Sequence, residues 1–179
     1  IWTAKEAMVP KRLPKSITII GSGAIGIEFA SFYNDMGSEV TVIEAEKNIL
    51  PNEDEEISEL AKLIFTKKGI NFFNNAYVQT IDQTKNNVIS KFKIDKRLYE
   101  IVSENILVAI GIKGNINNLG LEKFNIKTEN GHIVTNHKME TNIKNIYAIG
   151  DVTSPPWLAH KASHEGVIAA EMIAGHELN

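Results

Sequence analysis

The sequence has no cysteine among its 179 residues. These residues therefore form no disulfide, supply no thiolate nucleophile and bind no metal through sulfur, and we expect a cytoplasmic protein. No apolar run approaches the ~18 residues that a membrane span requires, and the first residues do not resemble a signal peptide. We expect no association with a membrane.

Charge of neither sign is in large excess, because the formal net charge is -3. This balance gives no reason to expect a nucleic-acid partner. Hydrophobic residues make up 43% and charged residues 23%, as in ordinary globular proteins. The length suits one domain, or one domain with a piece of another. The opening residues include no initiator methionine and read like the middle of a longer chain, so we expect a fragment.

Apolar β-branched runs alternate with helix patterns along the chain. They predict strands at 16–20, 39–44, 70–73, 105–111 and 146–150, with helices at 24–36, 51–69 and 160–173. Residues 76–102 are predicted to form a three-stranded β-meander, with a turn at 85–87. The fold class is therefore α/β, a Rossmann-like, mainly parallel sheet with helices on its faces and an added meander.

Two local predictions concern the ends of these elements. Pro10 and Pro14 favour an extended or irregular linker over residues 1–15. In the helix at 51–69, Ile57, Leu60 and Ile64 recur at helical spacing and predict its buried stripe.

A glycine triplet follows the first strand. Gly21, Gly23 and Gly26 have the G-x-G-x-x-G spacing, and they lie between a strand and a helix, as in dinucleotide-binding folds. In such a turn the first glycine permits the bend, the second lets a pyrophosphate approach, and the third allows close packing. The phosphates then meet the free N–H groups of a helix N-terminus. The alternative is a purely structural glycine turn.

Glu44 ends the second strand, 18 residues after Gly26. An acid there is placed to bind the ribose hydroxyls of NAD and to repel the 2′-phosphate of NADP. No arginine lies near it, and Lys47 is the nearest cation. We therefore predict that the site prefers NAD, unless Glu44 is merely an exposed acid.

Three ordered segments, "GSGAIGIEFASFY", "ILVAIG…LGLE" and "IYAIGDV…LAHKA…EG", resemble the pyridine nucleotide-disulfide oxidoreductases, and within them the dihydrolipoamide dehydrogenase branch. The resemblance implies an FAD domain that is interrupted by an NAD domain. Residues 1–15 would then be the linker from the first FAD half, 16–145 the NAD domain, and 146–179 the return into the FAD domain.

The resemblance also assigns residues to the two cofactors. Glu28 would lie near the nicotinamide and pair with a lysine beside the flavin, and Val78 and Gly111 would line the adenosine and nicotinamide ends of NAD. Asp151 would bind the ribitol of FAD, although a Gly-Asp pair is also common as a helix cap or turn. The predicted NAD set is Gly21, Ser22, Gly23, Ala24, Ile25, Gly26, Ile27, Glu28, Glu44, Val78 and Gly111; the predicted FAD set is Asp151, Trp157, Leu158, Ala159 and His160.

The sequence departs from the family pattern in three places, one of which is "SHEG" at 163–166 in place of a more acidic version. Ile112–Asn115 reads "IKGN" where the family commonly has Arg-x-Pro-Asn, and Trp157 replaces the more usual methionine. His160 and His164 could face one side of a helix, but a third metal ligand is not evident, so we predict no metal site. His132, His137 and His176 are isolated and are expected on the surface.

The resemblance implies that the redox-active cysteine pair and a His-Glu base lie outside these residues, so we expect no catalytic residue here. The whole protein would oxidise dihydrolipoamide on the acyltransferase of a 2-oxo acid dehydrogenase complex, reduce NAD through FAD, and work as a homodimer. The isolated chain would be inactive. The alternatives are a stand-alone NAD-binding or sensing module, and a related flavin disulfide reductase.

Overall fold

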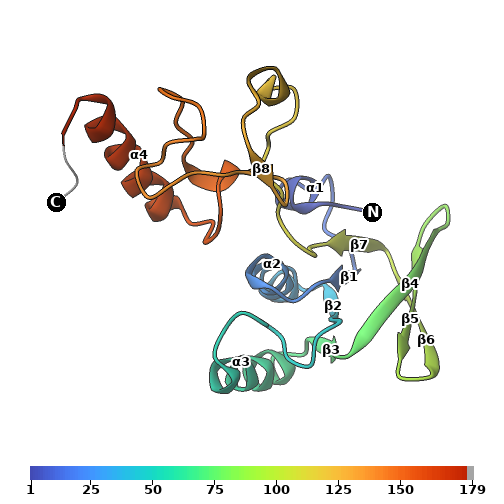
Figure 1. Ribbon diagram of the computed structural model, residues 1–179. Coiled ribbons are helices and arrows are strands. Elements are labelled where there is room, and N and C mark those ends of the chain that lie inside the picture. The colour runs from blue at the N-terminus through green and yellow to red at the C-terminus, as the bar shows by residue number, and fades with distance from the viewer. Residues whose placement is uncertain (177–179) are drawn as a thin grey trace. The chain divides into compact units, whose positions relative to one another are not determined.

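A four-stranded parallel sheet organises the first part of the chain (Figure 1). The structure is a computed structural model that describes residues 1–176. The chain divides into two units, unit 1 from Ile1 to Gly111 and unit 2 from Ile112 onward. The predicted boundaries after residues 15 and 145 concern cofactor binding, and they remain predictions.

The sheet of unit 1 has the strand order β3-β2-β1-β7, and all its neighbours pair in parallel. The chain steps outward from β1 and then returns to the other side of β1. In open α/β sheets, ligands bind at the carboxyl ends of the two strands where the order reverses, here β1 and β7. The strands are β1 (Ser16–Ile20), β2 (Glu39–Ile43), β3 (Asn71–Phe73) and β7 (Asn105–Val108).

The two faces of this sheet pack against different elements. Ile17 and Val40 belong to a buried cluster with Ala30 and Tyr33 of α2 (Ala24–Asp35). Thr18, between the apolar residues of β1, donates instead from its hydroxyl to Ser103 Oγ at 3.0 Å. Burial on both faces explains the nearly continuous apolar strands. The predicted parallel α/β fold is therefore confirmed.

The predicted meander is also confirmed. It comprises β4 (Ala76–Gln83), β5 (Val88–Ile94) and β6 (Arg97–Ser103), which pair antiparallel. Its apolar residues form a second core, in which Phe92 packs with Ile43 of β2 and with Ala76. Figure 1 shows the meander on the side of the sheet opposite to α2.

The prediction of an irregular segment over residues 1–15 is wrong for its first half. Helix α1 (Ala4–Met8) forms there, stabilised by a capping box in which the Thr3 N–H donates to Glu6 Oε2 at 2.8 Å. Trp2 extends the edge of the sheet, since its N–H donates to the Ile106 carbonyl at 2.7 Å. The two prolines restrict only the residues after α1.

The predicted buried stripe of the second helix is wrong as well. Helix α3 (Glu55–Lys67) exposes Ile57, Leu60 and Ile64 by 53%, 52% and 46%. Its buried residue is Ser58, whose hydroxyl donates to the Leu50 carbonyl at 3.2 Å. Phe65, about two turns later, packs on the core. The contacts that Ser58 and Phe65 make with the rest of unit 1 therefore set the orientation of the helix.

Unit 2 contains mostly short elements and one long helix. The hairpin of β8 and β9 turns at Asn130 and Gly131, whose φ angles of 50° and 83° are typical of a type I′ turn. Among residues 1–176, no helix has both the length and the apolar character to cross a membrane. The elements are η1 (Leu121–Phe124), β8 (Thr128–Glu129), β9 (His132–Ile133), η2 (Gly150–Val152) and α4 (Ala159–Ile173).

The predicted strand at 146–150 is wrong. Tyr147 forms only an isolated bridge with Glu140, and Ala148 N–H donates to the Met139 carbonyl. A strand requires a continuous ladder of partners for its backbone groups. Here a loop supplies single bonds instead, and η2 begins at Gly150.

Candidate functional site

The glycine turn joins β1 to α2 at the point where the strand order reverses. Gly21 has φ +96°, and a Cβ there would lie 2.5 Å from the Ala109 carbonyl oxygen just beyond β7. Its N–H donates to the Ile43 carbonyl at 2.9 Å. Only glycine fits this position, because both the conformation and the space exclude a side chain.

Gly26 and Gly23 differ in whether the packing of the fold requires glycine. A Cβ on Gly26 would lie 2.1 Å from the Gly21 carbonyl oxygen, so the fold itself demands glycine there. At Gly23 the φ of −64° suits any residue, and a Cβ would meet no atom within 4 Å. Neither the backbone conformation nor the packing therefore requires glycine at position 23. An open approach to the backbone is what a phosphate-binding turn needs at this point.

Helix α2 begins directly at this open backbone. Gly23 is its N-cap and offers no capping side chain, and the first intrahelical bond runs from Ile27 N–H to the Gly23 carbonyl at 3.0 Å. The N–H groups of Ala24, Ile25 and Gly26 precede that bond, so the helix leaves them without an internal acceptor. Together with the helix dipole they favour an anion.

Glu44 is buried at the carboxyl end of β2, with 7% of its surface exposed. Its Oε2 accepts bonds from both the N–H and the hydroxyl of Ser22, at 2.7 and 2.6 Å, and its Oε1 accepts from Glu46 N–H at 2.9 Å. An ionised carboxylate accepts about four hydrogen bonds. About one acceptor position thus remains for a ligand. The alternative of an exposed acid at position 44 is excluded by this burial.

Lys47, the nearest cation in sequence, is engaged elsewhere. Its Nζ lies 2.8 Å from Glu55 Oε1 at the start of α3. This hydrogen bond raises the pKa of Lys47 and lowers the pKa of Glu55. Both side chains are exposed, so the pair contributes little to stability.

Val78 and Gly111 lie at the same edge of the sheet as the turn. The carbonyl of Glu44 accepts the Ala76 N–H at 2.8 Å, which fixes the start of β4 two residues before the half-buried Val78. Gly111 follows β7 with φ +148° and has open space around it. The structure thus brings most of the predicted NAD residues to one edge.

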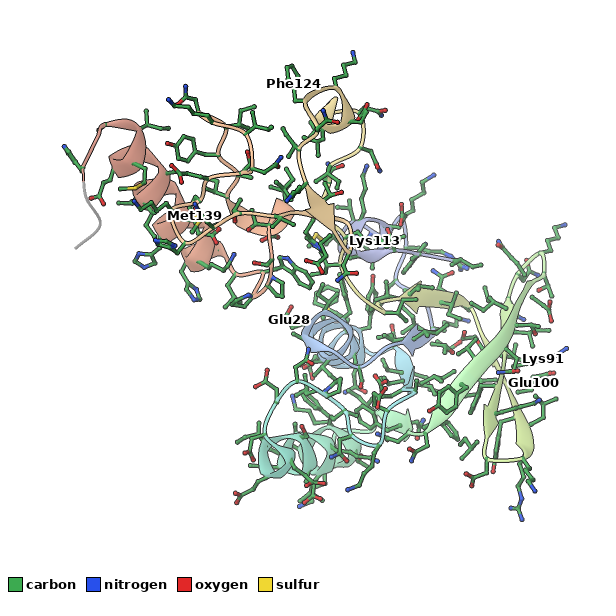
Figure 2. The ribbon with its side chains drawn as sticks, in the orientation of Figure 1. Glu28, Lys91, Glu100, Lys113, Phe124 and Met139 are labelled. Atoms are coloured by element: carbon green, nitrogen blue, oxygen red, sulfur yellow. The ribbon has the colours of Figure 1, made fainter. Side chains whose placement is uncertain are left out.

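Ile25 and Glu28 line a pocket of about 350 Å³ between α1 and α2. The other lining residues are apolar, among them Met8 and Phe29, so Glu28 is the one acidic group that residues 1–176 place in its wall. Glu28 is exposed on α2 (Figure 2). Ile25 and Glu28, two of the predicted NAD residues, are therefore accessible, whereas Ile27 is buried in the fold.

In unit 2, the Gly150–Asp151 turn is held from α4 by a residue that the sequence reasoning missed. Glu165 is buried, and its Oε2 accepts the Gly150 N–H at 2.7 Å while Oε1 lies 2.6 Å from Lys161 Nζ. Asp151 itself is exposed. Gly150 has φ +75°, so the turn uses glycine's left-handed conformation.

The other predicted FAD residues follow this turn. Trp157 is half-buried, and its Nε1–H donates to the Thr153 carbonyl at 3.0 Å. Leu158, Ala159 and His160 are exposed at the start of α4, and His164 is exposed one turn later. Within residues 1–176, no three His, Asp or Glu side chains gather as metal ligands would.

Comparison with known proteins places the chain in a family. The sequence model of the family described as "Pyridine nucleotide-disulphide oxidoreductase" matches residues 1–166. The chain belongs to this family. This confirms the resemblance carried by the three motifs.

Two curated members of the family are similar along almost the whole chain. The dihydrolipoyl dehydrogenases of Rhizobium etli and Bacillus subtilis are 46% and 45% identical to it. Each alignment covers 98% of this chain and 37% of the relative. The chain thus spans well under half the length of these relatives.

Solved structures agree with the fold of this family member. LpdA of Mycobacterium tuberculosis matches with a TM-score of 0.88 and 29% identity, over 100% of this chain and 39% of that one. The flavoprotein disulfide reductase RclA of Escherichia coli matches with a TM-score of 0.88 and 27% identity, over 99% and 40%.

Proposed function

We propose that residues 16–145 bind NAD, and that they do so as part of a dihydrolipoyl dehydrogenase. The observation that carries the proposal is the open backbone at Gly23. It lies at the N-terminus of α2 and next to the turn that Glu44 holds. The pyrophosphate would bind the free N–H groups there, and the adenosine ribose would bind the remaining acceptor position of Glu44.

The same geometry supports NAD over NADP. A 2′-phosphate would have to approach a buried carboxylate whose three bonded donors are all uncharged. Lys47, the nearby cation, is paired with Glu55. Like charges at close range in a partly buried site repel strongly, so the phosphate is disfavoured.

The proposed reaction belongs to the whole protein. FAD and NAD would supply the electron and hydride chemistry when bound, and the protein would supply position and electrostatics. NAD would lie along the carboxyl-end edge of the sheet, in contact with Val78, Gly111, Ile25 and Glu28. Asp151 and Trp157–His160 would complete an FAD site whose larger part lies outside this chain.

Dihydrolipoamide on an acyltransferase of a 2-oxo acid complex is the proposed substrate, with a homodimer in the cytoplasm as the working form. The sequence has no cysteine, so the cysteine pair for this step would come from the rest of the protein. The high identity to two dihydrolipoyl dehydrogenases favours this substrate over that of another flavin disulfide reductase.

Thermal unfolding of the purified chain with NAD, NADP or FAD tests the proposal. A ligand at 100 times its Kd adds about 2.7 kcal/mol to the free energy of unfolding. We expect a rise in Tm with NAD, a smaller one with NADP, none with FAD, and a colourless preparation without dihydrolipoamide oxidation. Retained yellow flavin, or equal stabilisation by FAD, would contradict it. If the protein were instead a stand-alone NAD-binding module, NAD would stabilise it in the same way, but the natural protein would lack the cysteine pair.

A further inference from the structure

His132 is not a surface residue, contrary to the prediction from its isolation in the sequence. It is 7% exposed, and its ring stacks on Trp157 with centroids 4.8 Å apart and an interplanar angle of 21°. The indole N–H of Trp157 is also held, because it donates to the Thr153 carbonyl. Among the described residues of unit 2, the Trp157 side chain thus has one stacking partner and one hydrogen-bond partner.

The nitrogen atoms of His132 show what orients its ring. Nδ1 lies 3.2 Å from the Asn130 carbonyl oxygen, which can only accept, so Nδ1 carries the proton and donates it. Nε2 is buried without a partner in the described part of the chain. A buried unpaired nitrogen is unfavourable. What histidine gains over a purely apolar ring is therefore the Nδ1 bond, which ties the ring to the β8-β9 turn.

Gly114 packs on the same ring. Its N–H donates to the Gly131 carbonyl at 3.1 Å. The proline that the family commonly has at this position has no N–H and could not make this bond. A Cβ on Gly114 would lie 2.8 Å from that carbonyl oxygen and 3.3 Å from His132 Cδ2. Two of the departures from the family pattern, the Ile112–Asn115 loop and Trp157, therefore meet at His132.

We propose that His132 is a positioning residue for Trp157 and, through it, for the segment Trp157–His160. The stack holds the indole, and the indole fixes the chain just before α4. The link from this segment to FAD rests on the proposed function, but the stack does not. In the whole protein, His132 would set the shape of the surface that faces the flavin.

Tryptophan fluorescence tests the stack in this chain. Trp2→Phe leaves Trp157 as the single tryptophan, and in that background His132→Leu keeps an apolar side chain without a ring, whereas His132→Phe keeps a ring. We expect His132→Leu to shift Trp157 emission to the red and to increase its quenching by acrylamide. His132→Phe should stay near wild type, and so should His137→Leu, the control at an exposed histidine of the same unit.

A His132→Leu variant with native circular dichroism and unchanged Trp157 emission and quenching would overturn the proposal, because the His132 ring would then not be needed to hold Trp157. If His132→Leu does not fold, His132→Phe decides: wild-type emission supports the stack, and exposed-type emission overturns it. In the full-length flavoprotein, His132→Leu should also change the flavin absorption spectrum. A changed Trp157 signal with an unchanged flavin spectrum would support the stack and count against the proposed FAD role of Trp157–His160.

Discussion

Ser22 donates both its backbone N–H and its hydroxyl to one oxygen of Glu44, at 2.7 and 2.6 Å. The glycine turn and the end of β2 are therefore a single hydrogen-bonded unit. Ser22 is fully buried, so water cannot replace these bonds. The acid assigned to the ribose also holds the turn assigned to the pyrophosphate.

Glu44→Ala should weaken NAD binding and also destabilise the chain. Loss of a charge-assisted bond to the ribose costs about 1.5 to 3 kcal/mol, or roughly tenfold or more in Kd. Ser22 N–H would in addition lose its acceptor. Calorimetric titration measures the affinity, and urea unfolding measures the stability. The matched variant Ser22→Ala keeps the carboxylate and its bond to the residue 22 N–H and removes only the hydroxyl bond, so it should lower stability by about 1.5 to 3 kcal/mol and weaken NAD binding less than Glu44→Ala does. Unchanged NAD affinity in Glu44→Ala would refute the ribose assignment.

Alanine at Gly23 and at Gly26 should give opposite results. Gly23→Ala has space and a permitted φ, so it should cost no more than about 1 kcal/mol, the preference for glycine over alanine at an N-cap, while NAD binding falls. Gly26→Ala places a Cβ 2.1 Å from a backbone oxygen, so it should destabilise the fold. Urea unfolding and NAD titration of both variants make the comparison. Full NAD affinity in a stable Gly23→Ala chain would mean that no phosphate approaches position 23.

Sequence patterns predicted the parts of the fold that depend on neighbouring residues. The glycine turn, the parallel strands and the meander each follow from short-range periodicity and turn chemistry. The orientation of α3 could not be predicted, because Ile57, Leu60 and Ile64 compete with the face of Ser58 and Phe65. Only packing against the sheet decides between two such faces.

The contacts inside the candidate sites could not be predicted from the sequence either, because they too depend on tertiary packing. Ser22 and Glu44 meet because β1 and β2 pair in register, not because of their spacing. Glu165 and Gly150 meet only once α4 has folded back on η2. His132 requires two further segments, those of Gly114 and Trp157. Side chains that hold a turn from a distant element leave no periodic signal.

Glu165→Gln should destabilise unit 2. The change leaves the largely buried Lys161 without its anionic partner, and breaking a buried ion pair typically costs about 3–5 kcal/mol. Glu171→Gln, at an exposed acid of the same helix, is the control and should have little effect. Hydrogen exchange of the amides in α4 and η2 measures the loss locally. Equal protection in both variants would show that the pair does not hold the turn.

Tyr33 should make the stability of unit 1 fall in alkali. Burial raises its pKa, and its hydroxyl donates to the Ala7 carbonyl at 2.6 Å. The unfolded chain loses this proton near pH 10, before the folded chain does, so the free energy of unfolding decreases as pH rises above about 10. Below that pH the group contributes no slope. Tyr33→Phe should reduce the alkaline slope in urea unfolding, whereas Tyr77→Phe, at an exposed tyrosine, should not. The same slope in all three chains would contradict the assignment.

The central claim is that the turn Gly21–Gly26 binds the pyrophosphate of NAD. Amide NMR spectra of the isotope-labelled chain, titrated with NAD, test it most directly. We predict that the largest shifts occur at Gly23, Ala24 and Ile25, with a second group at Ser22 and Glu46, whose amides bond to Glu44. Shifts confined to unit 2, or no saturable shift at the N-terminus of α2, would contradict the claim.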